Sequence, residues 1–412
     1  MYTENGAIMT SSYGSAVRRA AQALSAQGKD ANQIAKIVYD RDPDGYNYGI
    51  GIVVDGRGRA WPTSETLLKH ARVEIGNSLL GEYMSTASLS APLKEAVLRW
   101  QRIPEEYWDR FSLSIPSDAG TGAVKTAVEM ALQLYPYLQA IGVEELSWPA
   151  YKAIARISRI SCREFPIGEM MDGPDLLRIY QAGPMNTTGR VQSRETMEGR
   201  AEAAKGHPVL LDRAYSGFEY AHALGTLGYD AIMTMSYNDQ IRPFIEHDVP
   251  FWVSVSPTKA FGTFALRPCG MLLAYMPGES RSEEVDALAN TVTRARGSSF
   301  EHPVTRAFVS ALVHDLEALE LEHADILRRV AAAEHTWKER SAGTTLAELF
   351  TDRYAGLFRN PRVGDEAQAA IYGAHLYPVF TPGRCRLNIT GLPDDRDVAR
   401  EHVAVFARYC RG

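Results

Sequence analysis

Apolar and polar positions alternate along the chain in blocks that predict helices separated by short strands. Between residues 90 and 300, short apolar runs with the length of buried strands follow longer stretches that carry apolar residues at helical spacing. These runs are 110–115, 145–148, 176–182, 209–212, 251–255 and 271–275. Helices that alternate with buried strands favour a parallel sheet covered on both faces, so we predict an α/β fold with a three-layer α/β/α large domain and a mostly parallel sheet.

Helical periodicity also marks both ends of the chain. Residues 12–40 have the pattern of an amphipathic arm, and residues 303–341 have that of a long connecting helix. A predicted strand at 385–389 and a final helix at 395–409 follow. We therefore predict an N-terminal helical arm (1–45), a large domain (46–305) and a smaller α+β domain (306–412) that takes in part of the N-terminal segment.

Composition narrows the classes of protein to consider. The chain has 412 residues, is 45% hydrophobic and 23% charged, and carries a net charge of −6, which argues against a nucleic-acid-binding surface. Its apolar runs are too short to span a bilayer, and its N-terminus lacks an apolar signal core. The four cysteines are far apart, without a CxxC pair. We expect a cytoplasmic protein with no metal site and no nucleic-acid or membrane partner.

Polar residues follow the predicted strands at the positions where α/β sheets bind ligands. Ligands in such sheets lie outside the carboxyl ends of the strands. The residues that follow five of the predicted elements are Gly120 and Thr121, Trp148, Asn186, Asp212 and Tyr215, and Lys259. We expect these side chains to meet at one edge of the sheet.

Lys259 is the residue whose position demands most explanation. It follows the apolar run 249–255, lies among the hydroxyls of Ser256 and Thr258, and precedes Arg267 by eight residues. A lysine at the end of a buried strand is costly unless its charge is used or shifted. A Schiff base to a cofactor aldehyde is one use, with the hydroxyls and the arginine holding a phosphate. A surface lysine in a strand-to-loop turn is the alternative.

Other candidate positions also allow two interpretations. Asp212, just past a buried strand, needs a cation, which a protonated pyridine nitrogen or a neighbouring arginine would supply. The helix start at Gly120-Thr121-Gly122 would present backbone N–H groups to an anion, or be a plain capped helix start. Asn186 fits a turn, and Trp148 fits either a core position or a stacking position over a cofactor ring.

Taken in order, the motifs resemble those of the aspartate aminotransferase family, which are fold-type-I pyridoxal-phosphate enzymes. The resemblance covers roughly residues 45 to 412. The matching motifs are Gly120-Thr121-Gly122-Ala123, Ser147-Trp148-Pro149, Asn186-Thr187-Thr188-Gly189, Asp212-Arg213-Ala214-Tyr215-Ser216-Gly217-Phe218, Ser256-Pro257-Thr258-Lys259-Ala260-Phe261-Gly262 with Arg267, and Arg386-Leu387-Asn388-Ile389-Thr390-Gly391.

The resemblance implies a cofactor, pyridoxal 5'-phosphate, and a role for each matching residue. Lys259 would form the Schiff base and then act as the general base, Asp212 would pair the pyridine nitrogen, and Arg386 would bind the substrate's α-carboxylate. Arg384, on the same strand face, is an alternative clamp. The remaining cofactor contacts would come from Gly120, Thr121, Trp148, Asn186, Tyr215, Ser256 and Arg267, and Trp148 and Asn186 would also meet the substrate.

Weaker matches suggest an active site that is shared between two subunits. Tyr83 is similar to the family tyrosine that reaches the phosphate of the neighbouring subunit. Gly51 lies in a segment similar to the one that closes over substrate, and Arg294 is similar to the arginine that meets a distal substrate acid; a solvated basic turn is the alternative for Arg294. The resemblance therefore implies a homodimer.

The chain departs from the family pattern around the cofactor site. Tyr151 replaces the histidine under the pyridine-binding aspartate. The stretch from Trp148 to Asn186 is shorter than in the family, and the stretch from Asp212 to Lys259 is longer. We predict an aminotransferase that moves an amino group between an L-amino acid and a 2-oxo acid. An elimination, replacement or cyclising enzyme, for example one acting on S-adenosylmethionine, and a non-catalytic regulatory protein are the alternatives. The sequence does not identify the substrate.

Overall fold

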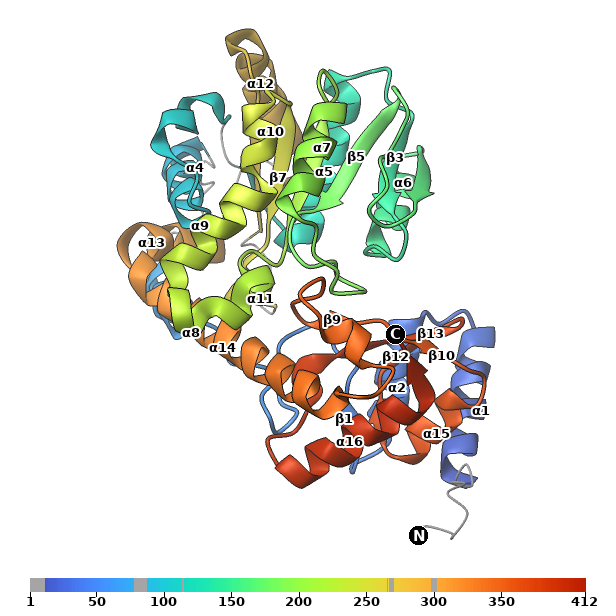
Figure 1. Ribbon diagram of the computed structural model, residues 1–412. Coiled ribbons are helices and arrows are strands. Elements are labelled where there is room, and N and C mark those ends of the chain that lie inside the picture. Colours follow the sequence, from blue (N-terminus) through green and yellow to red (C-terminus); the bar gives the residue numbers. More distant parts are fainter. Residues whose placement is uncertain (1–11, 78–86, 113–114, 265, 267–269, 298–301) are drawn as a thin grey trace. The chain divides into compact units, whose positions relative to one another are not determined.

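The computed structural model describes residues 12–77, 87–112, 115–264, 266, 270–297 and 302–412, and these form two compact units (Figure 1). The large unit consists of Pro62–Met185 and Val191–Leu327, and the small unit of Met1–Trp61, Asn186–Arg190 and Arg328–Gly412. The units thus end at other residues than the predicted domains: the N-terminal arm belongs to the small unit, and the large unit extends to Leu327.

A seven-stranded sheet forms the centre of the large unit. Only β8 runs against its neighbours, so β2, β7, β6, β5, β3 and β4 share one direction and their carboxyl ends lie at one edge. Five of the strands, β3, β5, β6, β7 and β8, are buried along their whole length, as expected for a sheet that is covered on both faces. The order across the sheet is β2 (Ile115–Ser117), β8 (Gly270–Tyr275), β7 (Phe251–Val255), β6 (Val209–Arg213), β5 (Leu176–Gln181), β3 (Ala140–Glu144) and β4 (Ser161–Phe165).

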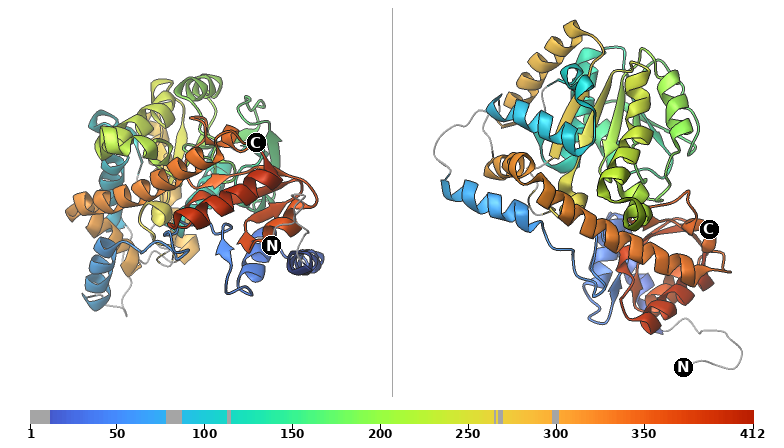
Figure 2. Two further views of the ribbon diagram at one scale, coloured as in Figure 1. Left: turned by 60° about the horizontal axis from the view of Figure 1, so that its bottom comes forward. Right: turned by 60° about the vertical axis from the view of Figure 1, so that its left-hand side comes forward.

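Helices cover both faces of this sheet (Figures 1 and 2). On one face α5 (Ala119–Leu134) packs on β6, β7 and β8, and α12 (Glu279–Gly297) packs on α5. On the other face lie α7 (Arg194–Ala203), α9 (Tyr229–Gln240) and α10 (Arg242–Glu246), which contact one another. The predicted three-layer arrangement is therefore confirmed.

The remaining helices of the large unit pack beside this layered core. Helix α13 contacts both α3 and α4, and α6 packs on β3 and β4. No helix in the described part of the chain is long and apolar enough to cross a bilayer. The remaining helices of the large unit are α3 (Glu65–Asn77), α4 (Ala87–Trp100), η1 (Glu105–Arg110), α6 (Ala150–Ile157), η2 (Phe218–Ala223), α8 (Leu224–Leu227), α11 (Pro257–Ala260) and α13 (Pro303–His314).

Several predicted elements were wrong in place or extent. Residues 145–148 form a turn after β3, because Leu146 has a positive φ of 57° and Pro149 is the N-cap of α6. The predicted strand 110–115 overlaps η1 at Arg110 and β2 at Ile115, and Phe111 between them makes an isolated bridge to Tyr275. The predicted helix 303–341 is two helices, α13 and α14 (Leu316–Ser341), separated at Asp315.

The small unit combines short strands with helices from both ends of the chain. Strands β12, β13, β10 and β14 form an antiparallel sheet, β9 also pairs with β13, and β1 pairs in parallel with β11. The predicted final helix is present as α16, with Asp395 as its N-cap. The bounds are α1 (Ser12–Ala26), α2 (Ala31–Tyr39), β1 (Tyr46–Asn47), η3 (Ala347–Phe350), β9 (Phe358–Arg359), β10 (Arg362–Val363), α15 (Ala367–Gly373), β11 (Leu376–Tyr377), β12 (Val379–Thr381), β13 (Arg384–Asn388), η4 (Ile389–Gly391), α16 (Arg396–Tyr409) and β14 (Cys410–Arg411).

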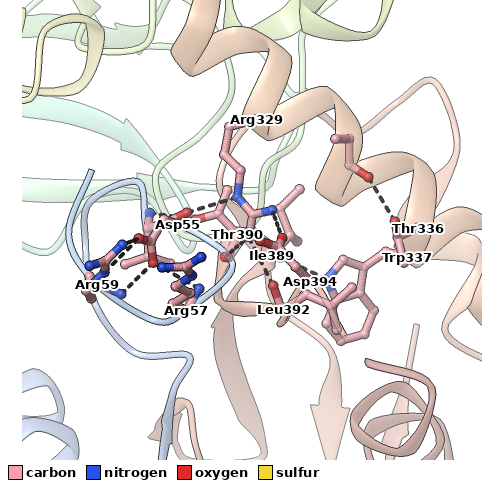
Figure 3. A network of polar contacts seen from close by, with 12 residues as sticks. Asp55, Arg57, Arg59, Arg329, Thr336, Trp337, Ile389, Thr390, Leu392 and Asp394 are labelled. Atoms are coloured by element: carbon pink, nitrogen blue, oxygen red, sulfur yellow. Dashed lines mark hydrogen bonds and ion pairs between the residues drawn. The ribbon is translucent and has the colours of Figure 1, made fainter. Parts of the chain in front are cut away.

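One arginine joins three segments of the small unit that are distant in sequence (Figure 3). Arg329 on α14 donates to the carbonyl oxygens of Val54, Thr390 and Leu392 at 2.8–3.0 Å, and to the carboxylate of Asp394 at 3.0 Å. These carbonyls belong to irregular segments that lack a complete set of ladder hydrogen bonds. Arg329 therefore fixes the loop after β1 and the segment that follows β13 to the same helix.

Candidate active site

Asp212 lies at the carboxyl end of β6, between two neighbouring parallel strands. It is paired with Gln181 of β5 on one side and Ser254 of β7 on the other. Its side chain is 8% exposed; Oδ2 accepts a hydrogen bond of 2.7 Å from the hydroxyl of Tyr151, and Oδ1 accepts one of 3.1 Å from the backbone N–H of Ala214. The carboxylate is therefore held at a fixed position on this edge of the sheet.

Burial and local charges act in opposite directions on Asp212. Burial raises the pKa of its carboxyl group, while the Tyr151 and Ala214 hydrogen bonds and the positive charge of Lys259 lower it. The net pKa lies above the usual value, so the isolated carboxylate is less stable here than in water. A cation close to its free lone pairs would offset that cost.

Lys259 lies on the neighbouring element at the same edge of the sheet. It follows β7 in the short helix α11 and is half-buried, and its charge acts on Asp212 across the two strands. The strand ends predicted to meet do so here: the ends of β6 and β7 bring together Asp212 and Lys259, which are 47 residues apart in the chain.

Trp148 and Tyr151 lie beyond the end of β3, which is separated from β6 by β5. Trp148 follows β3 and is half-buried, and its ring meets that of Tyr151 edge-on with centroids 5.3 Å apart. Tyr151 is 1% exposed, and burial together with the negative charge of Asp212 raises the pKa of its hydroxyl well above the ordinary value. Tyr151 is therefore a neutral hydrogen-bond donor to Asp212 at any physiological pH.

The start of α5 has the properties of an anion site. Gly120 is so close to Ser256 that a Cβ on it would lie 2.9 Å from the Ser256 Cβ, so only glycine fits without movement. The N-cap residue Asp118 makes no side-chain hydrogen bond to the first turn, and the hydroxyls of Ser256 and Thr258 lie 2.8 Å apart beside it. Backbone N–H groups of a first helical turn together with adjacent hydroxyls suit a phosphate.

A buried charge network underlies Tyr215. Arg213 is fully buried and donates to the carbonyl of Ala182 and to the hydroxyl of Ser236, both at 2.6 Å, and forms an ion pair with Glu219. Tyr215 is 5% exposed and packs edge-on against Phe218. The network fixes the backbone between Asp212 and Phe218, and so the position from which the Tyr215 hydroxyl extends.

In the small unit, Arg386 on β13 is held by residues of the N-terminal segment. Its Nη2 donates to Oδ1 of Asn32 at 2.8 Å and to the carbonyl of Gly49 at 3.0 Å, and its guanidinium lies over the ring of Phe358 at 4.6 Å. Arg384 instead donates to the carbonyl of Asn360 at 2.9 Å. The two candidate carboxylate clamps therefore have different surroundings, and only the Arg386 guanidinium packs on an aromatic face.

Other predicted substrate residues also belong to the small unit. Asn186 and Gly189 lie in the short segment Asn186–Arg190, which belongs to the small unit. Gly189 has φ of 74°, and a Cβ there would lie 2.2 Å from the carbonyl oxygen of Phe358. Gly51 lies in a loop that Asn388 fixes by donating to the carbonyls of Ile50 and Ile52 at 2.9 and 2.7 Å.

Three predicted site residues remain outside these groups. Arg294 is exposed on α12 of the large unit. Tyr83 and Arg267 lie outside the described residues. Sequence reasoning did not include Tyr151, Thr258 or Asn32 among the site residues. The first two could have been found from their spacing, three residues after Trp148 and one before Lys259, but no local signal marks Asn32.

The residues at the edge of the sheet match the chemistry of pyridoxal phosphate. The cofactor combines a basic ring nitrogen, an aldehyde and a phosphate, and the site offers a buried carboxylate, an amine and an anion-binding helix start. The buried Asp212 carboxylate, fixed by the Tyr151 hydroxyl at 2.7 Å, fits the cofactor, because a protonated ring nitrogen is a cation that would offset its burial. These features define the class: a cofactor-dependent enzyme of the fold-type-I kind.

The sequence model of the family described as aminotransferase class I and II matches residues 115–333, more than half of the chain. The protein belongs to this family, and it is a pyridoxal-phosphate-dependent transferase, an aminotransferase with amino-acid and 2-oxo-acid substrates. The predictions of family, fold class, enzyme class and cofactor are confirmed. No curated protein matches the chain by sequence.

Solved structures share the fold at low sequence identity. An aromatic-amino-acid aminotransferase from Burkholderia pseudomallei, covalently bound to pyridoxal phosphate, matches with a TM-score of 0.77 and 17% identity over 92% of this chain and 97% of its own. The cytoplasmic aspartate aminotransferase of Saccharomyces cerevisiae gives 0.71 and 18% over 92% and 97%. The broad-specificity aminotransferase of Leishmania mexicana gives 0.73 and 18% over 92% and 95%.

Proposed function

We propose that Lys259 is the residue that binds the cofactor covalently and then moves the substrate's α-proton, and that Asp212 holds the ring nitrogen. The observation that supports this assignment is the buried carboxylate of Asp212, fixed by Tyr151 at 2.7 Å and subject to the charge of Lys259 from the adjacent strand. When bound, the protonated ring withdraws electrons from the substrate's α-carbon.

The protein's own residues would divide the work around that ring. Asp212 keeps the ring nitrogen protonated, because a buried carboxylate stabilises a cation more than a neutral group. The Lys259 amine, released when substrate amine replaces it, accepts the α-proton at Nζ and returns it to a neighbouring carbon. Trp148 would hold the flat face of the ring, and Tyr215 and Asn186 would donate hydrogen bonds to its oxygen.

Binding of the phosphate and of the substrate would involve a second set of residues. Gly120, Thr121 and Ser256, with Arg267, hold the phosphate, and Tyr83 of a neighbouring subunit reaches it in a homodimer. Arg386 binds the α-carboxylate with a two-pronged fork, which a lysine could not provide. Gly51 and Arg294 complete the substrate side, and we propose that the enzyme works in the cytoplasm.

Replacement of one residue tests the assignment of Lys259. The wild-type protein, loaded with pyridoxal phosphate and reduced with borohydride, should carry the cofactor on the peptide that contains Lys259. Lys259→Ala should lose that attachment and lower kcat by more than about a thousandfold, because the general base and the covalent anchor disappear together.

The reaction type is measured in the same preparation. Release of a 2-oxo acid with formation of the pyridoxamine form of the cofactor identifies amino transfer. Attachment of the cofactor to another lysine, or full turnover by the Ala variant, would contradict the role given to Lys259. Cleavage of the substrate without amine transfer would contradict the proposed reaction.

A further inference from the structure

The guanidinium of Arg386 is oriented by a residue 354 positions away in the sequence. Oδ1 of Asn32, in the first turn of α2, accepts a hydrogen bond of 2.8 Å from Nη2 of Arg386. The same nitrogen donates to the carbonyl of Gly49 at 3.0 Å. Both acceptors therefore come from the N-terminal segment, and the sequence assigned no role in the site to Asn32.

The first turn of α2 is itself held in place. Asp30 is the N-cap and accepts from the N–H groups of Asn32 and Gln33 at 2.9 Å, and the Gln33 side chain returns a bond to the N–H of Asp30. This reciprocal capping box limits the freedom of the residue that bonds to Arg386. Ala35 and Val38 on the same helix are buried in the small unit.

Arg386 needs such a partner because of where it lies. It is 9% exposed and packs over the face of Phe358 at 4.6 Å, so water has little access to its donors. A flexible guanidinium that must present two N–H groups to a carboxylate loses affinity if it can rotate. The two acceptors on Nη2 fix the plane of the guanidinium before substrate arrives.

We propose that Asn32 is a positioning residue for α-carboxylate binding: the N-terminal helix α2 orients the Arg386 fork through the Asn32 amide oxygen. This inference rests on the proposed role of Arg386 and extends it to a residue of the N-terminal arm. The arm thus determines how tightly an amino acid binds, in addition to covering the small unit.

A negative charge introduced at position 32 tests the proposal without disturbing the fold. Asn32→Asp keeps the acceptor oxygen and places a negative charge at a helix N-terminus, where it is favourable for stability. The same charge beside Arg386 competes with the substrate's carboxylate. Gln33→Glu adds the same charge one residue later, on a side chain that bonds to the Asp30 backbone rather than to Arg386, and is the matched control.

The experiment compares substrates with and without the carboxyl group on the cofactor-loaded enzyme. The donors are the best of the standard L-amino acids in the wild-type assay and the amine that lacks only its carboxyl group. Calorimetric binding of the corresponding amine-free carboxylic acid is the second readout. Thermal unfolding of each variant is the third.

We expect Asn32→Ala to raise KM for the amino acid and Kd for the acid about tenfold, with kcat nearly unchanged, as for the loss of a hydrogen bond to a charged group. Asn32→Asp should weaken binding further without lowering Tm. Rates with the amine and all values for Gln33→Glu should match wild type.

Two sets of results would contradict the inference about Asn32, and they differ in whether the proposed role of Arg386 also fails. Wild-type binding of the acid by both Asn32 variants, or equal losses with the amine and a lower Tm, would overturn the positioning role. Arg386→Ala is measured in parallel: if that variant binds the acid as wild type does, the role proposed for Arg386 fails, and the inference about Asn32 fails with it.

Discussion

At the scale of single residues, the hydrogen bond between Tyr151 and Asp212 distinguishes this chain from the pattern it resembles. A tyrosine hydroxyl stands where the family pattern has an imidazole, which would titrate near neutral pH. The pKa of the Tyr151 hydroxyl is instead raised well above its usual value by burial and by the charge of Asp212. The donor therefore stays protonated, and the Asp212 carboxylate keeps this hydrogen bond across the physiological pH range.

Removal of that hydroxyl gives the first prediction. Tyr151→Phe should weaken binding of pyridoxal phosphate about tenfold, because a buried carboxylate loses a charge-assisted hydrogen bond and its pKa rises further. Cofactor affinity is measured by absorbance titration of the apoenzyme. Tyr237→Phe is the control, since Tyr237 is a buried tyrosine of the same unit whose hydroxyl has no hydrogen-bond partner among the described residues. Equal affinities for the two variants would show that the Tyr151 bond contributes nothing.

Replacement of Asp212 by a neutral residue should affect thermal stability and catalysis differently. Because its folded-state pKa is raised, the ionised form costs free energy in the cofactor-free protein, and that cost is present above the folded pKa and absent at lower pH. Asp212→Asn should therefore leave the Tm of the apoenzyme at pH 7.5 equal to or above wild type while reducing kcat at least a hundredfold. The Tm advantage should shrink as the pH falls toward about 4. A lower Tm for the variant at pH 7.5 would contradict this account of burial.

At the scale of elements, helix α14 stabilises the small unit through Arg329 more than through its surface charges. The arginine donates hydrogen bonds to the backbone carbonyls of Val54, Thr390 and Leu392. Farther along the same helix, Lys338 reaches Asp352 at 3.8 Å, and both side chains are exposed. Hydrogen bonds to buried backbone groups outweigh such surface pairs.

Arg329→Met and Lys338→Met test this difference. The methionine at position 329 keeps the length of the aliphatic chain but leaves three carbonyls without donors, so we expect a loss of about 2–4 kcal/mol in the free energy of unfolding. The change at position 338 should cost less than about 1 kcal/mol. Denaturant titration followed by circular dichroism measures both. Similar losses for the two variants would indicate that the Arg329 contacts are not stabilising.

At the scale of the whole molecule, each unit contains a histidine that is kept neutral by burial. Burial lowers the pKa of His402 in the small unit to about 4 and that of His323 in the large unit to about 3. The His402 ring bonds to the hydroxyl of Tyr48 at 2.8 Å, and the His323 ring bonds to that of Tyr229 at 2.9 Å. Protonation of either histidine in the folded protein therefore lowers the free energy of unfolding.

This arrangement predicts loss of stability in mild acid. Above about pH 6.5 the folded and unfolded chains are both neutral at these histidines. Below it the unfolded chain binds protons that the folded chain excludes, so stability falls until the pH reaches the folded pKa. His402→Gln should reduce the decline in Tm between pH 7 and pH 4.5, whereas His335→Gln, at an exposed position of α14, should not. An unchanged slope in the His402 variant would contradict the prediction.

The sequence by itself predicted β5, β6, β7 and β8 and the order of the motifs, and hence the edge of the sheet where Asp212 and Lys259 meet. That was possible because strand periodicity and the residues that follow each strand are local signals, and parallel strands bring their carboxyl ends to one edge. Local signals were weaker at 145–148, where a positive φ at Leu146 ends the run. They were also weaker at Asp315, where two helices share one apolar period.

Only the tertiary structure decided which side chains support the motif residues. The Tyr151 hydroxyl reaches Asp212 across 61 positions, and the Asn32 amide reaches Arg386 across 354. Such pairs depend on how elements pack, and periodicity along one element carries no information about its distant neighbour. The chemistry of the site was therefore legible in the chain, whereas the contacts that hold its charged groups in place required the folded protein.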